Sequence, residues 1–146
     1  MTDISRFLSA EHTHCDDLFV EAENAIASAD WQNGLAHFQA FEAATLHHFM
    51  REEAVLFPAF EARTGMSHGP TTVMRGEHDD VRETLQGMGQ ALAKHDAETY
   101  LGLAETLLML LRQHNLKEEQ MLYPMADQAM ADTASEIVRR MEALPA

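Results

Sequence analysis

The sequence is poor in features that would mark a secreted, membrane-spanning or nucleic-acid-binding protein. Cys15 is the only cysteine, so no internal disulfide can form, which favours a reducing compartment. The most apolar run, Leu107 to Leu111, is far too short to cross a bilayer, and the N-terminus does not resemble a signal peptide. The net charge of −14 disfavours contact with phosphate backbones. We therefore expect a cytoplasmic protein with no membrane and no nucleic-acid partner.

The alternating pattern of β-strands is also missing, and helical periodicity dominates instead. At 146 residues the chain is long enough for one domain, residues 1–146, with a good core. The pattern predicts an all-α fold, an antiparallel up-down four-helix bundle followed by a short C-terminal helix. The predicted helices run from Ser5–Ser9 to Ala29, from an N-cap at Asp30 to about Ala62, from Thr71 to Lys94, from His95-Asp96 onward, and from Thr133 to about Leu144.

Three local patterns refine this prediction. Pro58 and Pro124 should kink the second and fourth helices or end their regular portions, because proline removes a helical hydrogen bond. Helical spacing places Met121 on the core-facing stripe of the fourth helix. Thr133 and Glu136 have the spacing of a capping box, which would open the last helix.

The most informative pattern that is present is an internal repeat. The segment His48-Phe-Met-Arg-Glu-Glu-Ala-Val-Leu-Phe-Pro recurs as His114-Asn-Leu-Lys-Glu-Glu-Gln-Met-Leu-Tyr-Pro, and from 48 to 114 the offset is 66 residues. The same offset carries Glu11-His12 onto Glu77-His78. Two copies of a helix pair should therefore be related by a pseudo-twofold axis. Duplicated histidines and glutamates of this kind are typical of a two-metal site on that axis.

Six residues form the predicted metal ligands, because they obey the repeat and fall on core-facing stripes. A histidine and a glutamate four residues apart lie on one helix face, within reach of a common ion. Buried imidazoles without partners would each cost about 1–3 kcal/mol, and metal binding removes that cost. The natural division gives two imidazoles to each metal, with the two carboxylates bridging. The predicted ligands are His12, His48, Glu52, His78, His114 and Glu118.

The ligand types narrow the range of metals that this site would bind. Imidazole and carboxylate without thiolate suit iron, manganese or zinc, and carboxylate-bridged pairs in bundles are most often iron. The ferritin plan of two Glu-x-x-His motifs fails, because Glu11-x-x-His14 has Glu77-x-x-Asp80 as its second copy. Two carboxylates in place of four stabilise high-valent iron less well. This favours mild or reversible chemistry with a small diatomic molecule or peroxide.

The remaining candidate residues have weaker patterns. His14 and His47 neighbour predicted ligands but fall on other helix faces. Glu53 and Glu119 obey the repeat, and we interpret them as hydrogen-bond partners of the ligands, with direct coordination as the alternative. Cys15 lies near the core stripe and is interpreted as a packed thiol. The histidines without a symmetry partner, interpreted as surface residues, are His37, His68 and His95.

This arrangement resembles the hemerythrin-like, or HHE cation-binding, domain. The resemblance rests on His12, on His78 and on the two His-x-x-x-Glu-Glu-x-x-Leu-Phe/Tyr-Pro segments, and it spans about residues 5–145. It implies a non-haem di-iron centre, with an oxo or hydroxo bridge when oxidised. It also implies binding or sensing of oxygen, nitric oxide or peroxide. The alternatives are an enzyme that repairs iron centres or reduces nitric oxide or peroxide, iron storage or buffering, and a metal that only stabilises the fold; no feature identifies a redox partner.

The sequence departs from oxygen-carrying hemerythrins at two positions. Those proteins have a second histidine four residues before the position of His78, where this chain has Met74. They also place an aspartate five residues after the last histidine, where this chain has Glu119, although Glu118 matches the repeat better. The resemblance therefore predicts a more open metal face than a carrier has.

Overall fold

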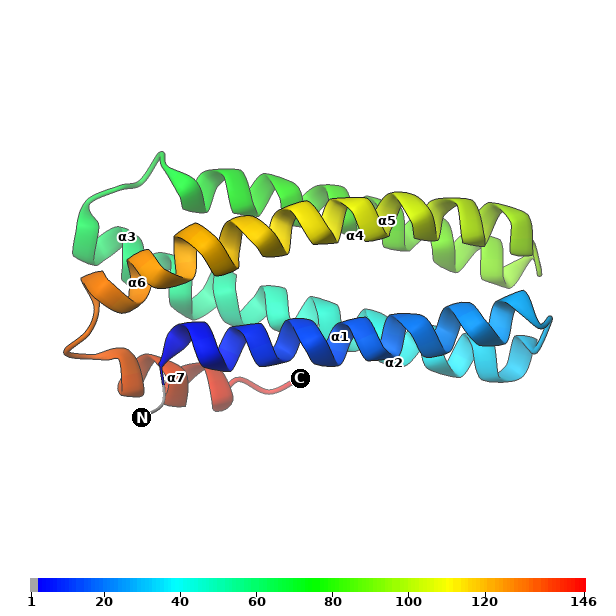
Figure 1. The fold of residues 1–146 in the computed structure, drawn as a ribbon, viewed down its shortest axis with the longest axis horizontal. Coiled ribbons are helices and arrows are strands. Elements are labelled where there is room, and N and C mark those ends of the chain that lie inside the picture. The colour runs from blue at the N-terminus through cyan, green and yellow to red at the C-terminus, as the bar shows by residue number, and fades with distance from the viewer. Residues whose placement is uncertain (1–2) are drawn as a thin grey trace.

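The computed structural model describes residues 3–146, and within that range every regular element is helical (Figure 1). Two of the long helices are interrupted by a π-helical segment, so that α2, η1 and α3 are continuous, as are α5, η2 and α6. The elements are α1 (Ile4–Ala27), α2 (Trp31–Arg51), η1 (Glu52–Leu56), α3 (Phe57–Thr64), α4 (Pro70–Ala93), α5 (Ala97–Lys117), η2 (Glu118–Leu122), α6 (Tyr123–Ala129) and α7 (Ala134–Glu142).

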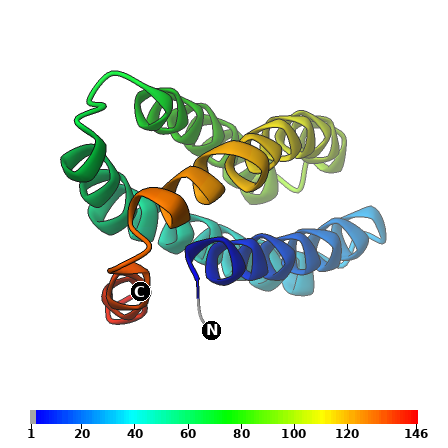
Figure 2. The ribbon, with the colours of Figure 1, turned by 60° about the vertical axis from the view of Figure 1, so that its left-hand side comes forward.

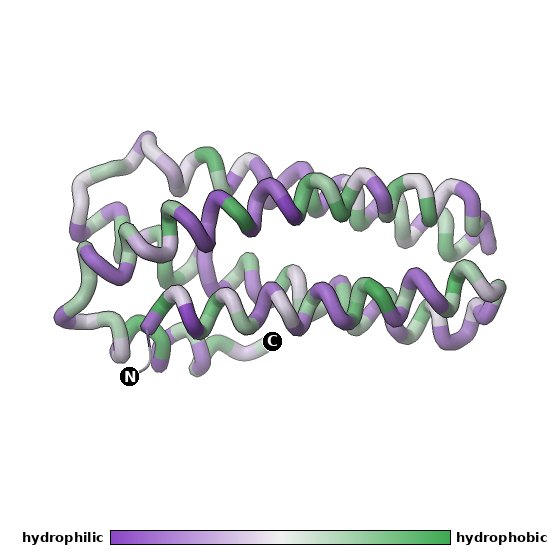
Figure 3. The backbone as a smooth tube through the Cα atoms, viewed as in Figure 1, coloured by the Kyte–Doolittle hydropathy of each residue, from purple (hydrophilic) through white to green (hydrophobic). Residues whose placement is uncertain are grey.

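The predicted bundle of four long helices with a short fifth helix is confirmed. In Figure 1, α1 and α2 form one antiparallel hairpin and α4 and α5 form the other. Polar and apolar residues alternate along each of them (Figure 3), so each helix has one face for the core. None of the helices within residues 3–146 has the length and apolar character needed to cross a bilayer.

The two hairpins turn in the same way. Ala29 and His95, related by the 66-residue offset, both adopt left-handed backbone conformations, with φ of 59° and 52°. After each of them an aspartate donates its N–H to a helix carbonyl 2.9 Å away, which closes a Schellman turn. The side chains of Asp30 and Asp96 then accept from the backbone of the next helix, as the predicted N-cap at Asp30 requires. The repeat therefore extends to the turns.

The prolines coincide with π-helical turns. The N–H of Phe57 donates to the carbonyl of Glu52, five residues earlier, and Tyr123 does the same with Glu118. The regular α-helices thus end at Arg51 and Lys117, one π-turn before each proline, in agreement with the prediction that their regular portions end near the prolines. The extra residue in each π-turn shifts the helical phase. Met121 is 59% exposed, so its predicted core position is wrong, whereas its equivalent Val55 is buried where α7 packs against η1.

Two apolar clusters fill the bundle, one on each side of a polar middle layer. The first lies toward the hairpin turns and includes Phe19, Phe41 and Tyr100. The second lies toward α7 and includes Phe57 and Tyr123. The predicted metal ligands occupy the layer between them.

The last helix lies outside the four long ones (Figure 2). It packs against α1 and η1, and the side chain of Arg51 donates to the carbonyl of Met141 at 2.9 Å. Thr133 is the N-cap residue, but its side chain makes no capping hydrogen bond, so the predicted capping box is wrong. Packing of Ile137, Val138 and Met141 in the second cluster holds α7 in place instead.

Candidate metal centre

The structure brings all six predicted ligands into the polar middle layer. Each of them is 5% exposed or less, and together they come from all four long helices of the bundle, with Glu52 and Glu118 in the π-helical segments. Their donor atoms form two groups that share Glu118, with the atoms of each group within 4.8 Å of one another. One group is His12, His48 and Glu118; the other is Glu52, His78, His114 and Glu118.

The distances between donor atoms are short in both groups. Glu118 Oε1 lies 3.1 Å from His12 Nε2 and 3.2 Å from His114 Nε2. Glu52 Oε1 lies 3.1 Å from His78 Nε2 and 3.5 Å from His48 Nε2. Each carboxylate therefore contacts imidazoles of both halves, which is the placement that a bridging ligand needs.

Four donor atoms of this layer are buried without a hydrogen-bond partner. They are Glu52 Oε1, Glu118 Oε2, His78 Nε2 and His114 Nε2. Such orphaned groups cost about 1–3 kcal/mol each, and more when charged. All four are lone-pair donors directed at the same small volume, so a cation would satisfy them together. The residues present therefore fit a metal.

Each of the four imidazoles is held from outside by another carboxylate. The hydrogen bond joins the imidazole Nδ1 to a glutamate oxygen, which can only accept, so the proton lies on Nδ1 and the Nε2 lone pair points inward. The pairs are His12–Glu119 at 2.6 Å, His48–Glu11 at 2.8 Å, His78–Glu53 at 2.6 Å and His114–Glu77 at 2.9 Å. This pattern orients metal-binding histidines in many proteins.

The outer carboxylates show why Glu53 and Glu119 obey the repeat. Glu118 is fully buried, whereas the side chain of Glu119 is 42% exposed and faces the rear of His12. Glu11 and Glu77 form the same kind of hydrogen bond, which nothing in the sequence indicated beyond the repeated Glu-His pair. Their partners His48 and His114 lie on other helices, so the contact depends on how the helices dock.

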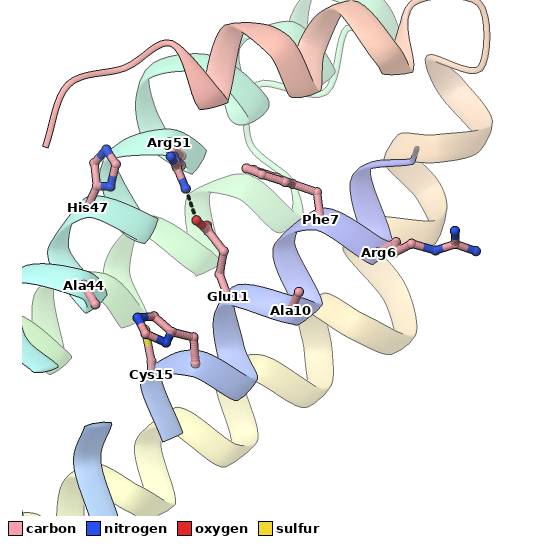
Figure 4. Close-up of a pocket in the computed structure, with 9 residues that line it drawn as sticks. Arg6, Phe7, Ala10, Glu11, Cys15, Ala44, His47 and Arg51 are labelled. Atoms are coloured by element: carbon pink, nitrogen blue, oxygen red, sulfur yellow. Dashed lines mark hydrogen bonds and ion pairs between the residues drawn. The ribbon is translucent and has the colours of Figure 1, made fainter. Parts of the chain in front are cut away.

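Three of the four outer carboxylates also form an ion pair with a cationic side chain. Arg51 forms an ion pair with Glu11, drawn in Figure 4, and Lys117 forms the equivalent pair with Glu77. Arg82 binds Glu53 at 2.9 Å. The residue that the 66-residue offset places opposite Arg82 is Asp16, which is an anion, so the symmetry breaks beside Glu119.

The two buried carboxylates favour positive charge at His48 and His114 and raise the pKa of both imidazoles. Burial lowers the pKa of His48, but Glu52 and Glu118 outweigh that effect and raise the pKa to about 9. Burial also opposes ionisation of Glu118, yet hydrogen bonds with Glu52 and the surrounding imidazoles bring its pKa well below the usual range. Without a metal, the centre therefore takes up protons. A bound metal cation would supply the same charge.

Tyr123 enters the layer although the sequence did not single it out. Its hydroxyl donates to Glu52 Oε2 at 2.6 Å, and Glu118 Oε1 lies 2.9 Å away. The equivalent residue in the first half is Phe57, which has no hydroxyl. Burial and the two carboxylates raise the pKa of Tyr123 well above its usual value. The Phe-to-Tyr difference between the two copies was the signal that could have identified it.

The two halves also differ in access from solvent. On one side Phe49 stacks on His78 with ring centroids 3.8 Å apart, and the guanidinium of Arg82 lies over Phe49. The residue equivalent to Phe49 is Asn115, which lines a surface groove of about 560 Å³ between α1 and α5. His12 lines this groove as well. A small inner cavity bordered by His12, His48 and Asn115 lies behind it.

The other candidate histidines lie away from the donor groups, whereas Cys15 also borders the small inner cavity beside His12 and His48. His14 and His47 line a surface pocket of about 530 Å³ with Arg6 and Phe7 (Figure 4), and His47 Nε2 lies 3.1 Å from the carbonyl oxygen of Leu144. Cys15 reaches the same pocket, and burial raises the pKa of its thiol. The three histidines without symmetry partners also lie apart: His37 forms an ion pair with Glu21, His95 stacks on Trp31, and His68 is exposed.

Met74 is buried in the second apolar cluster, one turn before His78 on α4. An apolar side chain therefore stands where an oxygen-carrying hemerythrin would have a histidine. Pro70 and Met121 lie beside it in a mainly apolar pocket. This position contributes packing on the α7 side of the centre.

These features define a class: a helical bundle with buried histidine and glutamate groups that fit a metal. Residues 3–126 match the model of the hemerythrin HHE cation-binding domain. The match covers most of the chain, which therefore belongs to this family, and family membership implies a bound metal, typically iron. The matched region ends before α7 and so is shorter than the resemblance in sequence suggested. No curated protein and no solved structure gave a significant match.

Proposed function

We propose that this protein holds two iron ions and uses them to bind or sense oxygen, nitric oxide or peroxide. The observation that carries the proposal is the pair of buried donor groups that share Glu118, with four of their donor atoms left unpaired. One ion would lie between His12 and His48, and the other between His78 and His114. Glu52 and Glu118 would bridge them, with an oxo or hydroxo group in the oxidised state.

Iron, when bound, supplies one-electron redox chemistry and coordination positions for small molecules. The surrounding chain holds the ligands in place: four outer glutamates fix the imidazole tautomers and keep every Nε2 lone pair directed inward. Apolar clusters on both sides limit the water that reaches the centre. This combination suits mild chemistry with a small neutral molecule.

The limited access from solvent to the centre favours binding of small molecules over exchange of metal ions. All six ligands are buried, so a hydrated cation would have to open the bundle to leave or enter. A diatomic molecule needs much less room, and the groove between α1 and α5 reaches His12 directly. A storage or buffering role, which depends on ion exchange, fits this geometry less well.

The test combines metal analysis with spectroscopy. Protein expressed with ample iron should contain about two irons per chain, as six ligands in two groups require. The reduced protein, mixed anaerobically with nitric oxide, should change its optical spectrum at once. His78→Ala should lose metal, whereas the matched variant His14→Ala should retain it. One metal per chain, or zinc alone despite ample iron, would refute the proposal.

The same experiment separates binding from catalysis. Mixing the reduced protein with excess peroxide or nitric oxide distinguishes a single spectral change from continued consumption of the added molecule. A sensor or binding protein gives one change per metal centre. Sustained consumption with an added reductant would identify a reductase instead.

A further inference from the structure

Tyr123 has an unusual position for a tyrosine of an apolar core. It begins α6, directly after the π-turn, and it is fully buried. Its Oη lies 2.6 Å from Glu52 Oε2 and 2.9 Å from Glu118 Oε1. The same oxygen lies 3.2 Å from His12 Nε2 and 3.4 Å from His48 Nε2. One phenol oxygen thus contacts four of the six predicted ligands.

These contacts bring together more lone pairs than hydrogens. The phenol has one hydrogen to donate, and it faces two carboxylate oxygens and two imidazole nitrogens. The protons of His12 and His48 are engaged on Nδ1 with Glu119 and Glu11. Their Nε2 atoms lie only 3.1 Å apart, so in the neutral imidazoles that a metal requires the two lone pairs converge next to the phenol oxygen. A cation at this point would satisfy all of these donors at once.

The repeat provides an internal control for the ring. Phe57, the equivalent of Tyr123, stacks on His78 with ring centroids 5.7 Å apart and planes at 21°. Tyr123 stacks on His12 with centroids also 5.7 Å apart and planes at 27°. The two rings therefore fill equivalent places in the core. Phenylalanine is sufficient for this packing at position 57, so packing alone does not explain the hydroxyl of Tyr123.

We propose that Tyr123 is a seventh protein ligand, which binds through Oη to the metal held by His12, His48 and Glu118. This inference rests on the proposed two-metal function. On binding, the Oη–H bond breaks as the Oη–metal bond forms, the proton leaves to the solvent, and no electron is transferred. The two metal positions then become unequal, because only one of them has an anionic phenolate oxygen. That position should favour trivalent iron.

Resonance Raman spectroscopy of the iron(III) protein tests this assignment. A phenolate bound to iron(III) gives a visible charge-transfer band, and excitation in that band enhances tyrosine ring vibrations. The wild-type protein should show both, and Tyr123→Phe should lose both while it keeps its iron. The chain has only two tyrosines, and Tyr100 lies in the other apolar cluster, so the assignment is unambiguous.

The repeat also supplies a positive control. Adding Phe57→Tyr to Tyr123→Phe moves the hydroxyl to the His78 side, where it should restore a visible band. Circular dichroism of each variant reports whether it folds, and metal analysis is made on the same samples.

Three results would overturn the inference. A wild-type protein with two irons but no tyrosine vibrations would make Tyr123 a hydrogen-bond donor only, and the proposed function would stand. Persistence of the vibrations in Tyr123→Phe would also overturn it. Fewer than two irons in the wild type would refute the proposed function, and this inference with it.

Discussion

Glu119 binds His12 from outside the metal centre, with its Oε2 2.6 Å from the imidazole Nδ1. Glu53 holds His78 at the same distance, but it also accepts from Arg82. Burial raises the pKa of Glu53, yet the hydrogen bonds from His78 and Arg82 lower it to about 2. Asp16 stands where the first half would need the equivalent of Arg82. Of the two carboxylates, only Glu53 therefore has a cationic partner behind it.

The first prediction concerns these two carboxylates. Glu119→Gln and Glu53→Gln should each weaken metal binding about 10–100-fold, because loss of such a partner frees the imidazole and lowers its basicity. Glu119→Gln should have the larger effect, since the ion pair with Arg82 already makes Glu53 a weaker acceptor for the His78 hydrogen bond. Competition with a chelator, followed by metal analysis, measures both. Negligible losses would show that these carboxylates do not tune their histidines, and equal losses would show that Arg82 makes no difference.

A second prediction concerns the inner carboxylates. Glu118 belongs to both donor groups, whereas Glu52 belongs to one. Glu118→Ala should therefore lose more metal than Glu52→Ala, even though the repeat alone would predict equal losses. Metal content per chain of the two purified variants measures the difference. If Glu52→Ala lost as much metal as Glu118→Ala, the centre would be more symmetric than these distances indicate.

A third prediction concerns stability and the hairpin turns. Ala29 has a φ of 59°, which costs a residue with a Cβ about 1 kcal/mol or more. Ala29→Gly should therefore stabilise the metal-free protein by about 1 kcal/mol and raise its Tm by roughly 3 °C. Ser28 next to it has a φ of −92°, so Ser28→Gly is a matched control that should give no gain. A stabilised control and an unchanged Ala29→Gly would contradict the strain argument.

His95 shares the conformation of Ala29 but should respond differently. His95→Gly would relieve the same strain, but it would also remove the ring that stacks on Trp31 with centroids 4.6 Å apart. The gain in Tm should consequently be smaller than for Ala29→Gly. Thermal unfolding of the two variants side by side makes the comparison.

The repeat explains why much of this centre could be predicted from the sequence. The offset of 66 residues selects four of nine histidines, and helical spacing places a glutamate on the same face as two of them, His48 and His114. Burial of all six residues follows from these two facts together. The helices and their N-caps at Asp30 and Asp96 are likewise local features, set by periodicity and by side chains close in sequence.

What the sequence did not reveal depends on the π-turns and on helix docking. In an α-helix Tyr123 would lie about 140° around the axis from Glu118, five residues earlier. The π-turn brings the two onto one face. Met121 is exposed, although its equivalent Val55 is buried against α7, so helix docking decides that position. The contacts of Glu11 and Glu77 depend on the register between helices, which no local pattern specifies. Backbone irregularity and tertiary register thus account for the missed residues.

The last prediction concerns the route by which small molecules reach the centre. Asn115 borders both the groove between α1 and α5 and the inner cavity beside His48, whereas Phe49 fills the equivalent place and stacks on His78. Asn115→Phe should close this route and leave the ligands intact. We expect nitric oxide to bind the reduced variant about tenfold more slowly, which corresponds to roughly 1.4 kcal/mol of added barrier.

Stopped-flow mixing with nitric oxide measures this rate, and metal analysis verifies that the variant retains its iron. Asn115→Ala is the matched control: it removes the same amide but leaves the groove open, so its binding rate should equal that of the wild type or exceed it. Slow binding in both variants would assign the effect to the lost amide. An unchanged rate in Asn115→Phe would mean that small molecules enter elsewhere, with the surface pocket beside Cys15 as the next route to block.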